Sequence, residues 1–111
     1  MNQLLQTPSQ TVGPYFAYGL TPTQYAYDFK SLFTPVLAQP HAKGEHIQIT
    51  GQVIDGEGNP IHDAIVEISQ ADATGRFAGT PAEVAASGFT GFGRCGTGTF
   101  AKHHYLFDTV K

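Results

Sequence analysis

The sequence has little that would bind a charged polymer, cross a membrane or form a disulfide. It contains no tryptophan, a single cysteine, and only 14% charged residues, with a net charge of -3. One thiol cannot form an internal disulfide, which fits a reducing cytoplasm. No apolar run approaches the roughly 20 residues of a membrane span, and residues 1–11 show no secretory signal. The scattered Lys and Arg favour neither nucleic acid nor an anionic membrane as a partner.

Glycine, proline and apolar residues are abundant instead. There are 13 glycines and 7 prolines, and 41% of the 111 residues are hydrophobic. This apolar content is too high for a disordered chain, and the length allows one small domain. Many turn-forming residues with few charges indicate short strands joined by turns. We therefore expect an all-β fold, an antiparallel β-sandwich.

Alternating apolar and polar residues predict strands over residues 46–53, 64–70 and 104–110. Glycine and proline in residues 55–60 predict a tight turn between the first two strands, which we expect to be neighbours in an antiparallel sheet or sandwich. Residues 78–98 are rich in small residues without a period. We expect them to form a long loop, and such loops are often functional.

The N-terminal region differs in character. Three prolines interrupt residues 7–22 and predict an extended arm with a turn at Gly13–Pro14. Its apolar and aromatic side chains must lie on their own domain or on a partner. We divide the chain into an arm and connecting segment, residues 1–45, and a partial sandwich core, residues 46–111. Because the sequence stops directly after a strand pattern, we expect a truncated, incomplete sandwich.

The most specific signal is the run of 29 residues from Ile49 to Phe77. Its spacing resembles the signature of the intradiol ring-cleavage dioxygenase family, with an acidic residue, Glu67, between two apolar ones and an aromatic residue at the last position. The glycines of the signature are matched by Gly51, Gly58 and Gly75. The resemblance implies a β-sandwich of the intradiol dioxygenase type.

Two further stretches carry the same resemblance. Residues 7–15 resemble the N-terminal arm of the protocatechuate-cleaving members of the family. Residues 91–94 and 105–111 resemble the Gly-Arg loop and the strand before a Pro-Gly turn. The resemblance therefore covers nearly the whole chain, in the family's order.

The family holds ferric iron with two Tyr and two His, since a hard ion favours phenolate and imidazole donors. The first Tyr ligand falls at Phe77, whose phenyl ring has no oxygen, and the other three ligands lie beyond Lys111 in the family's order. Ser69 also replaces the usual Trp of the signature. These departures resemble the non-catalytic, alpha-type subunits. They imply no catalytic residue and no metal ligand in this chain, with ferric iron bound by a beta-type partner subunit.

In the family the active site lies between an alpha and a beta chain, and the alpha arm forms part of the pocket wall. The matched substrate-binding positions are Thr11, Gly13, Pro14 and Tyr15. The open alternative is that the arm only packs against the partner. The resemblance implies cleavage of protocatechuate by dioxygen to 3-carboxy-cis,cis-muconate, in the beta-ketoadipate pathway of aromatic catabolism, within a higher alpha–beta oligomer.

Two other interpretations stay open at this point. Stand-alone β-sandwich domains of the transthyretin-like or carboxypeptidase-regulatory-like type share the pattern of residues 51–66. The arm, residues 7–15, favours the dioxygenase subunit, because a generic sandwich has no reason to carry it. A third interpretation is a catalytic family member that has lost its rear half, and Phe77 argues against it.

Histidine pairs and clusters do not predict a metal site. His103 and His104 are adjacent, so on a strand they point to opposite faces and cannot hold one ion. The remaining histidines lie near turns or strand ends without metal-binding spacing, at His41, His46 and His62. We expect all five at the surface.

Four other polar residues have a structural and a functional interpretation. We expect Asp72 to accept hydrogen bonds from turn amides rather than to act as a catalytic carboxylate. Glu67 is expected to be ion-paired or at a subunit contact. Arg94 is expected to anchor its loop, with neutralisation of an acidic substrate as the alternative. We expect Cys95 to be incidental rather than reactive.

Overall fold

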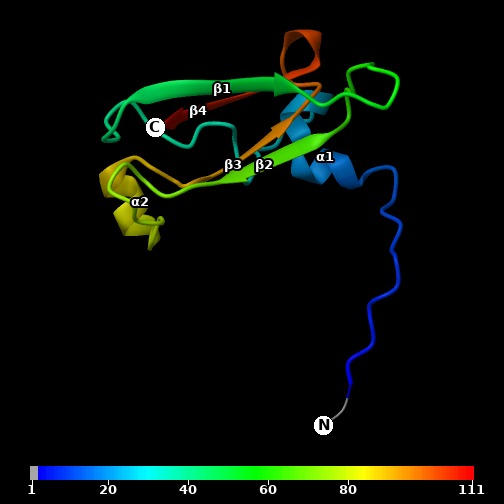
Figure 1. Ribbon diagram of the computed structural model, residues 1–111, viewed down its shortest axis with the longest axis horizontal. Helices are drawn as coiled ribbons and strands as arrows, with labels where there is room; N and C mark the ends of the chain where they lie inside the picture. Colours follow the sequence, from blue (N-terminus) through cyan, green and yellow to red (C-terminus); the bar gives the residue numbers. More distant parts are fainter. Residues whose placement is uncertain (1–2) are drawn as a thin grey trace.

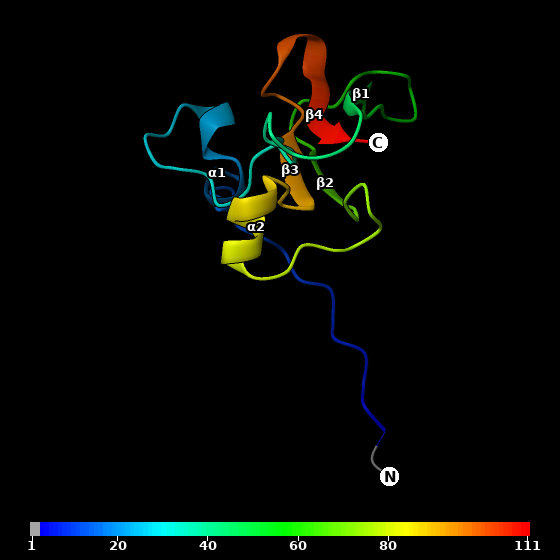
Figure 2. The same ribbon diagram turned by 90° about the vertical axis from the view of Figure 1, so that its left-hand side faces the viewer.

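Strands dominate the computed structural model, which describes residues 3–111. They form two antiparallel pairs, β1 with β4 and β2 with β3. Figure 1 shows the pairs as separate layers, and Figure 2 shows the same separation from the side. The expected incomplete, antiparallel all-β sandwich is confirmed. The strands are β1 (His46–Gln52), β2 (Ile65–Ser69), β3 (Phe92–Gly96) and β4 (His104–Val110).

The first two strands, expected as neighbours in an antiparallel sheet or sandwich, do not pair with each other in one sheet but lie in different layers of the sandwich. β1 runs from His46, opposite Val110, to Gln52, opposite His104, and thus pairs with the last strand of the chain. Around the turn, an isolated bridge between Ile54 and Pro60 joins the two segments, and the Ile61 amide donates to the Val53 carbonyl (2.8 Å). Both strands have an apolar face, and placing them in different layers directs both faces toward one core.

Residues 34–39, expected as part of a connection, lie between the two layers. The Leu37 amide donates to the carbonyl of Asp108 in β4 (2.8 Å), and the Asp108 amide donates to the Pro35 carbonyl (3.0 Å). On the other side, the Arg94 amide of β3 donates to the Thr34 carbonyl (3.1 Å). This segment therefore links the two strand pairs. The expected division between residues 45 and 46 stays a prediction.

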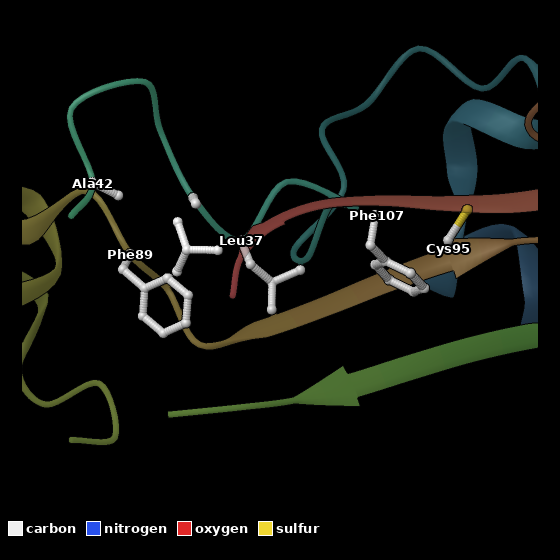
Figure 3. Close-up of a cluster of buried hydrophobic side chains, with 7 residues drawn as sticks. Leu37, Ala42, Phe89, Cys95 and Phe107 are labelled. Atoms are coloured by element: carbon white, nitrogen blue, oxygen red, sulfur yellow. The ribbon is translucent and has the colours of Figure 1, made fainter. Parts of the chain in front are cut away.

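The core lies where this segment meets both pairs (Figure 3). Leu37 and Phe107 are completely buried. A methyl group on Gly93 would contact both of these side chains, so only glycine lets them pack directly on β3. The rest of the buried apolar cluster consists of Ala38, Ala42, Phe89, Cys95 and Val110.

The inner face of β1 is only half covered. Ile49 lies opposite Phe107 in the register, so both side chains point to the same face of the pair. Phe107 is completely buried, whereas Ile49 is 38% exposed. The alternation had therefore assigned the correct face of β1. Burial of that face is incomplete because nothing in residues 3–111 covers its outer half.

The arm contains a helix that the prolines had not suggested. The turn at Gly13–Pro14 is confirmed by a hydrogen bond from the Phe16 amide to the Gly13 carbonyl (3.2 Å). Helix α1 (Phe16–Leu20) follows it, and the 3₁₀ turn η1 (Pro22–Tyr25) comes next. The prediction of an extended chain over residues 7–22 was wrong beyond this turn, because five residues between two prolines suffice for one short helix.

The long loop expected over residues 78–98 was also wrong, because it contains α2 (Pro81–Ser87) and β3. The Thr80 hydroxyl accepts a hydrogen bond from the Glu83 amide (3.3 Å), and Gly88 ends the helix at φ +71°. Pro81 occupies the first turn, where a missing amide proton costs nothing. A second 3₁₀ turn, η2 (Ala101–His103), precedes β4. None of the helices within residues 3–111 is long and apolar enough to cross a bilayer.

Candidate functional site

The N-terminal arm extends away from the strand layers (Figure 1). Every residue from 3 to 16 is exposed, and Tyr15 is 74% exposed. A methyl group placed on Gly13 would have no neighbour within 4 Å. The structure therefore presents Thr11, Gly13, Pro14 and Tyr15 together on one exposed segment.

An aromatic cluster stands at the base of the arm. The Tyr18 ring lies 5.8 Å from the Tyr15 ring, 4.7 Å from the Tyr25 ring and 5.0 Å from the Tyr27 ring, measured between centroids. Such tilted and edge-on pairs stabilise a packed aromatic group. Tyr18 thereby packs against one side of the Tyr15 ring, and the rest of the Tyr15 ring stays exposed to solvent. Nothing in the sequence sets Tyr18 apart from the other aromatic residues of the arm.

Two contacts fasten this base to the strand layers. The first is a glycine notch, in which Gly96 and Gly98 lack the side chains that would displace Gln24. The Gln24 amide nitrogen donates to the His62 carbonyl from this position (2.9 Å). Nothing in the sequence pattern had indicated the notch, since it joins segments 38 and more residues apart.

The second contact is made by Arg94 of β3. Its Nε donates to Glu67 Oε1 on β2 (2.7 Å), and its Nη1 donates to the carbonyl of Leu20, the last residue of α1 (3.4 Å). The ion pair expected at Glu67 is confirmed. Arg94 was expected to anchor its own loop. It lies in β3 instead, and its side chain contacts β2 and the end of α1, so its observed contacts are structural but differ from the expected ones.

Phe77 lies in a different place, in the loop before α2. Its ring is 71% exposed and lines a cavity of about 480 Å³. Figure 1 shows α2 at the end of the strand layers away from α1 and the arm. The structure therefore does not bring Phe77 and Tyr15 into one site. The charged and histidine side chains around the cavity are His41, Lys43, Asp72, Arg76 and Glu83.

The Asp72 carboxylate serves the turn that leads to Phe77, as expected. Its Oδ1 accepts hydrogen bonds from the Thr74 hydroxyl (2.6 Å), the Thr74 amide (2.9 Å) and the Arg76 amide (3.0 Å). These donors, the Thr74 hydroxyl first, hold the pKa of Asp72 below its usual value. The carboxylate is thus committed to backbone structure rather than to a ligand.

The residues around Phe77 do not fit a ferric ion. The phenyl ring supplies no donor atom, and a ferric ion, as a hard cation, favours oxygen and imidazole ligands. Within residues 3–111, no group of three or more His, Cys, Asp or Glu side chains converges. His103 lies in η2 and His104 begins β4, so the adjacent histidines do not share one strand face.

Cys95 is buried in the core at 2% exposure. Burial raises the pKa of its thiol, because the thiolate would lose its hydration. Its Sγ lies 3.5 Å from the Gly96 carbonyl oxygen. A thiol in this setting is unreactive, in agreement with the prediction that Cys95 is incidental.

Comparison with known proteins agrees with the signature in the sequence. A family model described as Dioxygenase matches residues 12–111. The chain is 61% identical over 111 residues to a protocatechuate 3,4-dioxygenase alpha chain of Burkholderia cepacia, covering all of this chain and 56% of the relative. It is 40% identical over 114 residues to the alpha chain of Pseudomonas putida, covering 97% of this chain and 53% of that relative.

A beta chain is also similar. The protocatechuate 3,4-dioxygenase beta chain of Burkholderia cepacia is 39% identical over 71 residues, which cover 61% of this chain and 29% of the relative. The chain spans about half the length of the alpha chains that it matches. Since the family model matches residues 12–111, and the alpha-chain relative matches the whole chain, including the signature at residues 49–77, the chain belongs to the intradiol ring-cleavage dioxygenase family.

Proposed function

We propose that the chain acts as the alpha-type subunit of a protocatechuate 3,4-dioxygenase. In this function it supports the cleavage of protocatechuate by dioxygen to 3-carboxy-cis,cis-muconate, a step of the beta-ketoadipate pathway of aromatic catabolism. The alpha-chain relatives at 61% and 40% identity support the proposal. We place the protein in the cytoplasm, where its single thiol stays reduced.

The observation that carries this proposal is the exposed arm. Its apolar and aromatic side chains lie in solvent, and an arm of this composition is stabilised when another surface covers it. We propose that this surface belongs to a beta-type partner in a higher alpha–beta oligomer, and that the exposed residues 3–16 face this partner. The beta-chain relative supports a partner of the same family.

The arm then forms one wall of the partner's substrate pocket. Gly13 has no side chain, so its backbone can approach an aromatic ring closely. Pro14 fixes the backbone after it, and Thr11 offers a hydroxyl. Tyr15 offers a ring face for the substrate and a phenolic hydroxyl. These groups bind and orient the ring and exclude water on one side of it.

Iron belongs to the partner in this proposal. When bound, ferric iron makes the catecholate reactive toward dioxygen. By the resemblance to the family, Phe77 falls at the position of the first tyrosine ligand, and its ring has no donor atom, which supports a chain that binds no iron itself.

Substitution of Tyr15 tests the proposal in the full-length chain assembled with its beta-type partner. Tyr15→Ala is expected to raise KM for protocatechuate on the order of 10-fold, since a ring contact is worth about 1 kcal/mol or more. Tyr15→Phe separates the hydroxyl from the ring. Phe77→Ala is the matched control, because it removes an exposed ring at the other end of the layers and is expected to leave KM unchanged. An unchanged KM in Tyr15→Ala contradicts a pocket function for the arm.

Phe77→Tyr tests the assignment of iron to the partner. We expect the full-length Phe77→Tyr chain, purified alone, to bind no iron and to stay colourless, because a ferric site needs further oxygen and imidazole ligands, which this proposal assigns to the beta-type partner. Stoichiometric iron with the orange-red colour of an iron–tyrosinate would instead support a catalytic chain. A pull-down with the beta-type chain tests partnership directly, and failure to form a complex would favour a stand-alone β-sandwich domain.

A further inference from the structure

We propose that Arg94 is the positioning residue of the arm, setting the direction in which Thr11 to Tyr15 reach the partner's pocket. The inference rests on the proposed function of the arm and adds a residue that touches neither substrate nor iron. It follows from the contacts that one guanidinium makes with β2, with the end of α1 and with the segment that follows η1.

The guanidinium of Arg94 joins three segments that are distant in the sequence. It donates to Glu67 on β2 (2.7 Å) and to the Leu20 carbonyl (3.4 Å), and its central carbon lies 5.1 Å from the centroid of the Phe33 ring. Phe33 in turn packs edge-on against Phe92 of β3, with 4.6 Å between centroids. The two hydrogen bonds leave from the edge of the guanidinium, and the Phe33 ring packs against its face.

These contacts are well placed to resist movement of α1. The Arg94 side chain is only 12% exposed, so its hydrogen bonds are partly shielded from water. Leu20 ends the helix, where carbonyl groups lack intrahelical donors and favour a cation. A planar, forked guanidinium can donate in two directions while stacking on a ring, and a lysine ammonium cannot.

The arm amplifies small changes at this base. Tyr15 lies about 7 Å from Leu20 along the helix at 1.5 Å per residue. Thr11 lies up to about 13 Å further along extended chain at 3.3 Å per residue. A tilt of α1 by about 10° therefore moves Thr11 by up to about 3.5 Å. Displacements of 1 Å in a substrate-positioning group can lower activity by about 100-fold.

Loss of the Arg94 side chain removes one of the two contacts that join α1 and η1 to the strand layers and leaves the other in place. Gln24 stays in its glycine notch and bonded to His62, and both Thr21 and Pro22 are buried. We therefore expect an Arg94 variant to fold and to assemble with its partner while its arm samples several directions. The effect then falls on substrate binding rather than on the amount of complex.

The experiment uses the full-length chain assembled with its iron-containing beta-type partner. Arg94→Ala is expected to raise KM for protocatechuate on the order of 10-fold or more, with kcat per iron changed less than about 2-fold. Arg94→Lys is expected to recover part of the change, since it keeps the charge but not the fork. Arg76→Ala is the control, because Arg76 is an exposed arginine in the loop before α2. Glu67→Gln loosens the guanidinium without removing it, which covers the case that Arg94→Ala does not fold.

The outcomes separate this inference from the function on which it rests. A raised KM in both Arg94→Ala and Tyr15→Ala, at unchanged iron content and complex mass, supports it. A raised KM in Tyr15→Ala alone overturns the positioning inference and leaves the function of the arm intact. Unchanged KM values in both variants overturn both. Activity that falls only in proportion to assembled complex identifies a merely structural residue and also overturns the inference.

Discussion

The strand layers and the arm differ in what determines their conformation. In the layers, Leu37 and Phe107 are completely buried on Gly93, and hydrogen bonds join residues 34–39 to both strand pairs. In the arm, Val12 is 62% and Tyr15 74% exposed, and the only side-chain hydrogen bond of residues 3–13 is local, from Gln10 to the Pro8 carbonyl. The conformation of the layers is determined by their own packing. The arm, in contrast, carries apolar and aromatic side chains that remain exposed.

This difference means that the layers contribute most to the stability of the chain, whereas the arm is free to contribute to binding. A fully buried leucine contributes about 1.5–3 kcal/mol relative to an exposed one. The exposed apolar side chains of the arm contribute nothing comparable to folding of this chain. We therefore expect substitutions in the layers to change the free energy of unfolding, and substitutions in the arm to change binding to a partner or substrate.

Leu37→Ala is expected to give the largest stability difference between the two regions. It removes a completely buried side chain from the junction of the layers and leaves a cavity beside Phe107. We expect the full-length chain to lose about 2–5 kcal/mol in free energy of unfolding, measured by urea denaturation. Val12→Ala is the matched arm variant and is expected to stay within about 0.5 kcal/mol of wild type. Equal losses of unfolding free energy in Leu37→Ala and Val12→Ala would contradict the proposed difference between the layers and the arm.

Gly93→Ala and Gly13→Ala make the same comparison with one added methyl group. At Gly93 the methyl would collide with Leu37 and Phe107, and we expect a loss of about 1–3 kcal/mol from overpacking. At Gly13 the methyl meets open space, so the free energy of unfolding should not fall. Thermal denaturation of the two full-length variants measures the difference. A tolerated alanine at position 93 would mean that the two buried side chains can move apart.

Thr80→Ala tests a local contact of the layered region. Its hydroxyl caps α2 by accepting from the Glu83 amide, and removal of such a cap costs about 1 kcal/mol. Thr11→Ala removes an arm hydroxyl that lies in solvent and should leave stability unchanged. The two free energies of unfolding, measured side by side, give the result. No loss in Thr80→Ala would show that packing alone maintains α2.

Acid sensitivity is the smallest of the expected effects and also belongs to the layers. Hydrogen bonds lower the pKa of Asp72, and amides of the turn at residues 55–60 do the same for Asp55. Each carboxyl has a lower pKa in the folded state than its unfolded value of about 3.9, so its ionised form stabilises the folded state above about pH 3.9. This stabilisation is lost as the pH falls through the folded-state pKa. Residues 3–14 contain no titratable side chain. Asp72→Asn should reduce the loss of stability between about pH 4 and pH 2, measured by denaturation at each pH; an unchanged pH profile would contradict this linkage.

The sequence allowed several predictions that the structure confirms. Period-2 alternation located β1, β2 and β4, and it assigned Ile49 to the inner face. The Gly13–Pro14 turn was predicted from residue chemistry alone. Helix α2 was missed, although Thr80, Pro81 and Glu83 form a recognisable start and Gly88 a recognisable end. That signal was present in a stretch where small residues obscured it.

By itself, the sequence determined the strand positions, the family signature and the absence of a donor atom at Phe77, because periodicity and side-chain chemistry are local properties. Only the tertiary structure decided that β1 pairs with β4, that Leu37 fills the junction and that Arg94 reaches the end of α1. Alternation fixes which face of a strand is apolar, but not which distant strand will pair with it. Partners across 50 or more residues are chosen by how well all the faces pack at once.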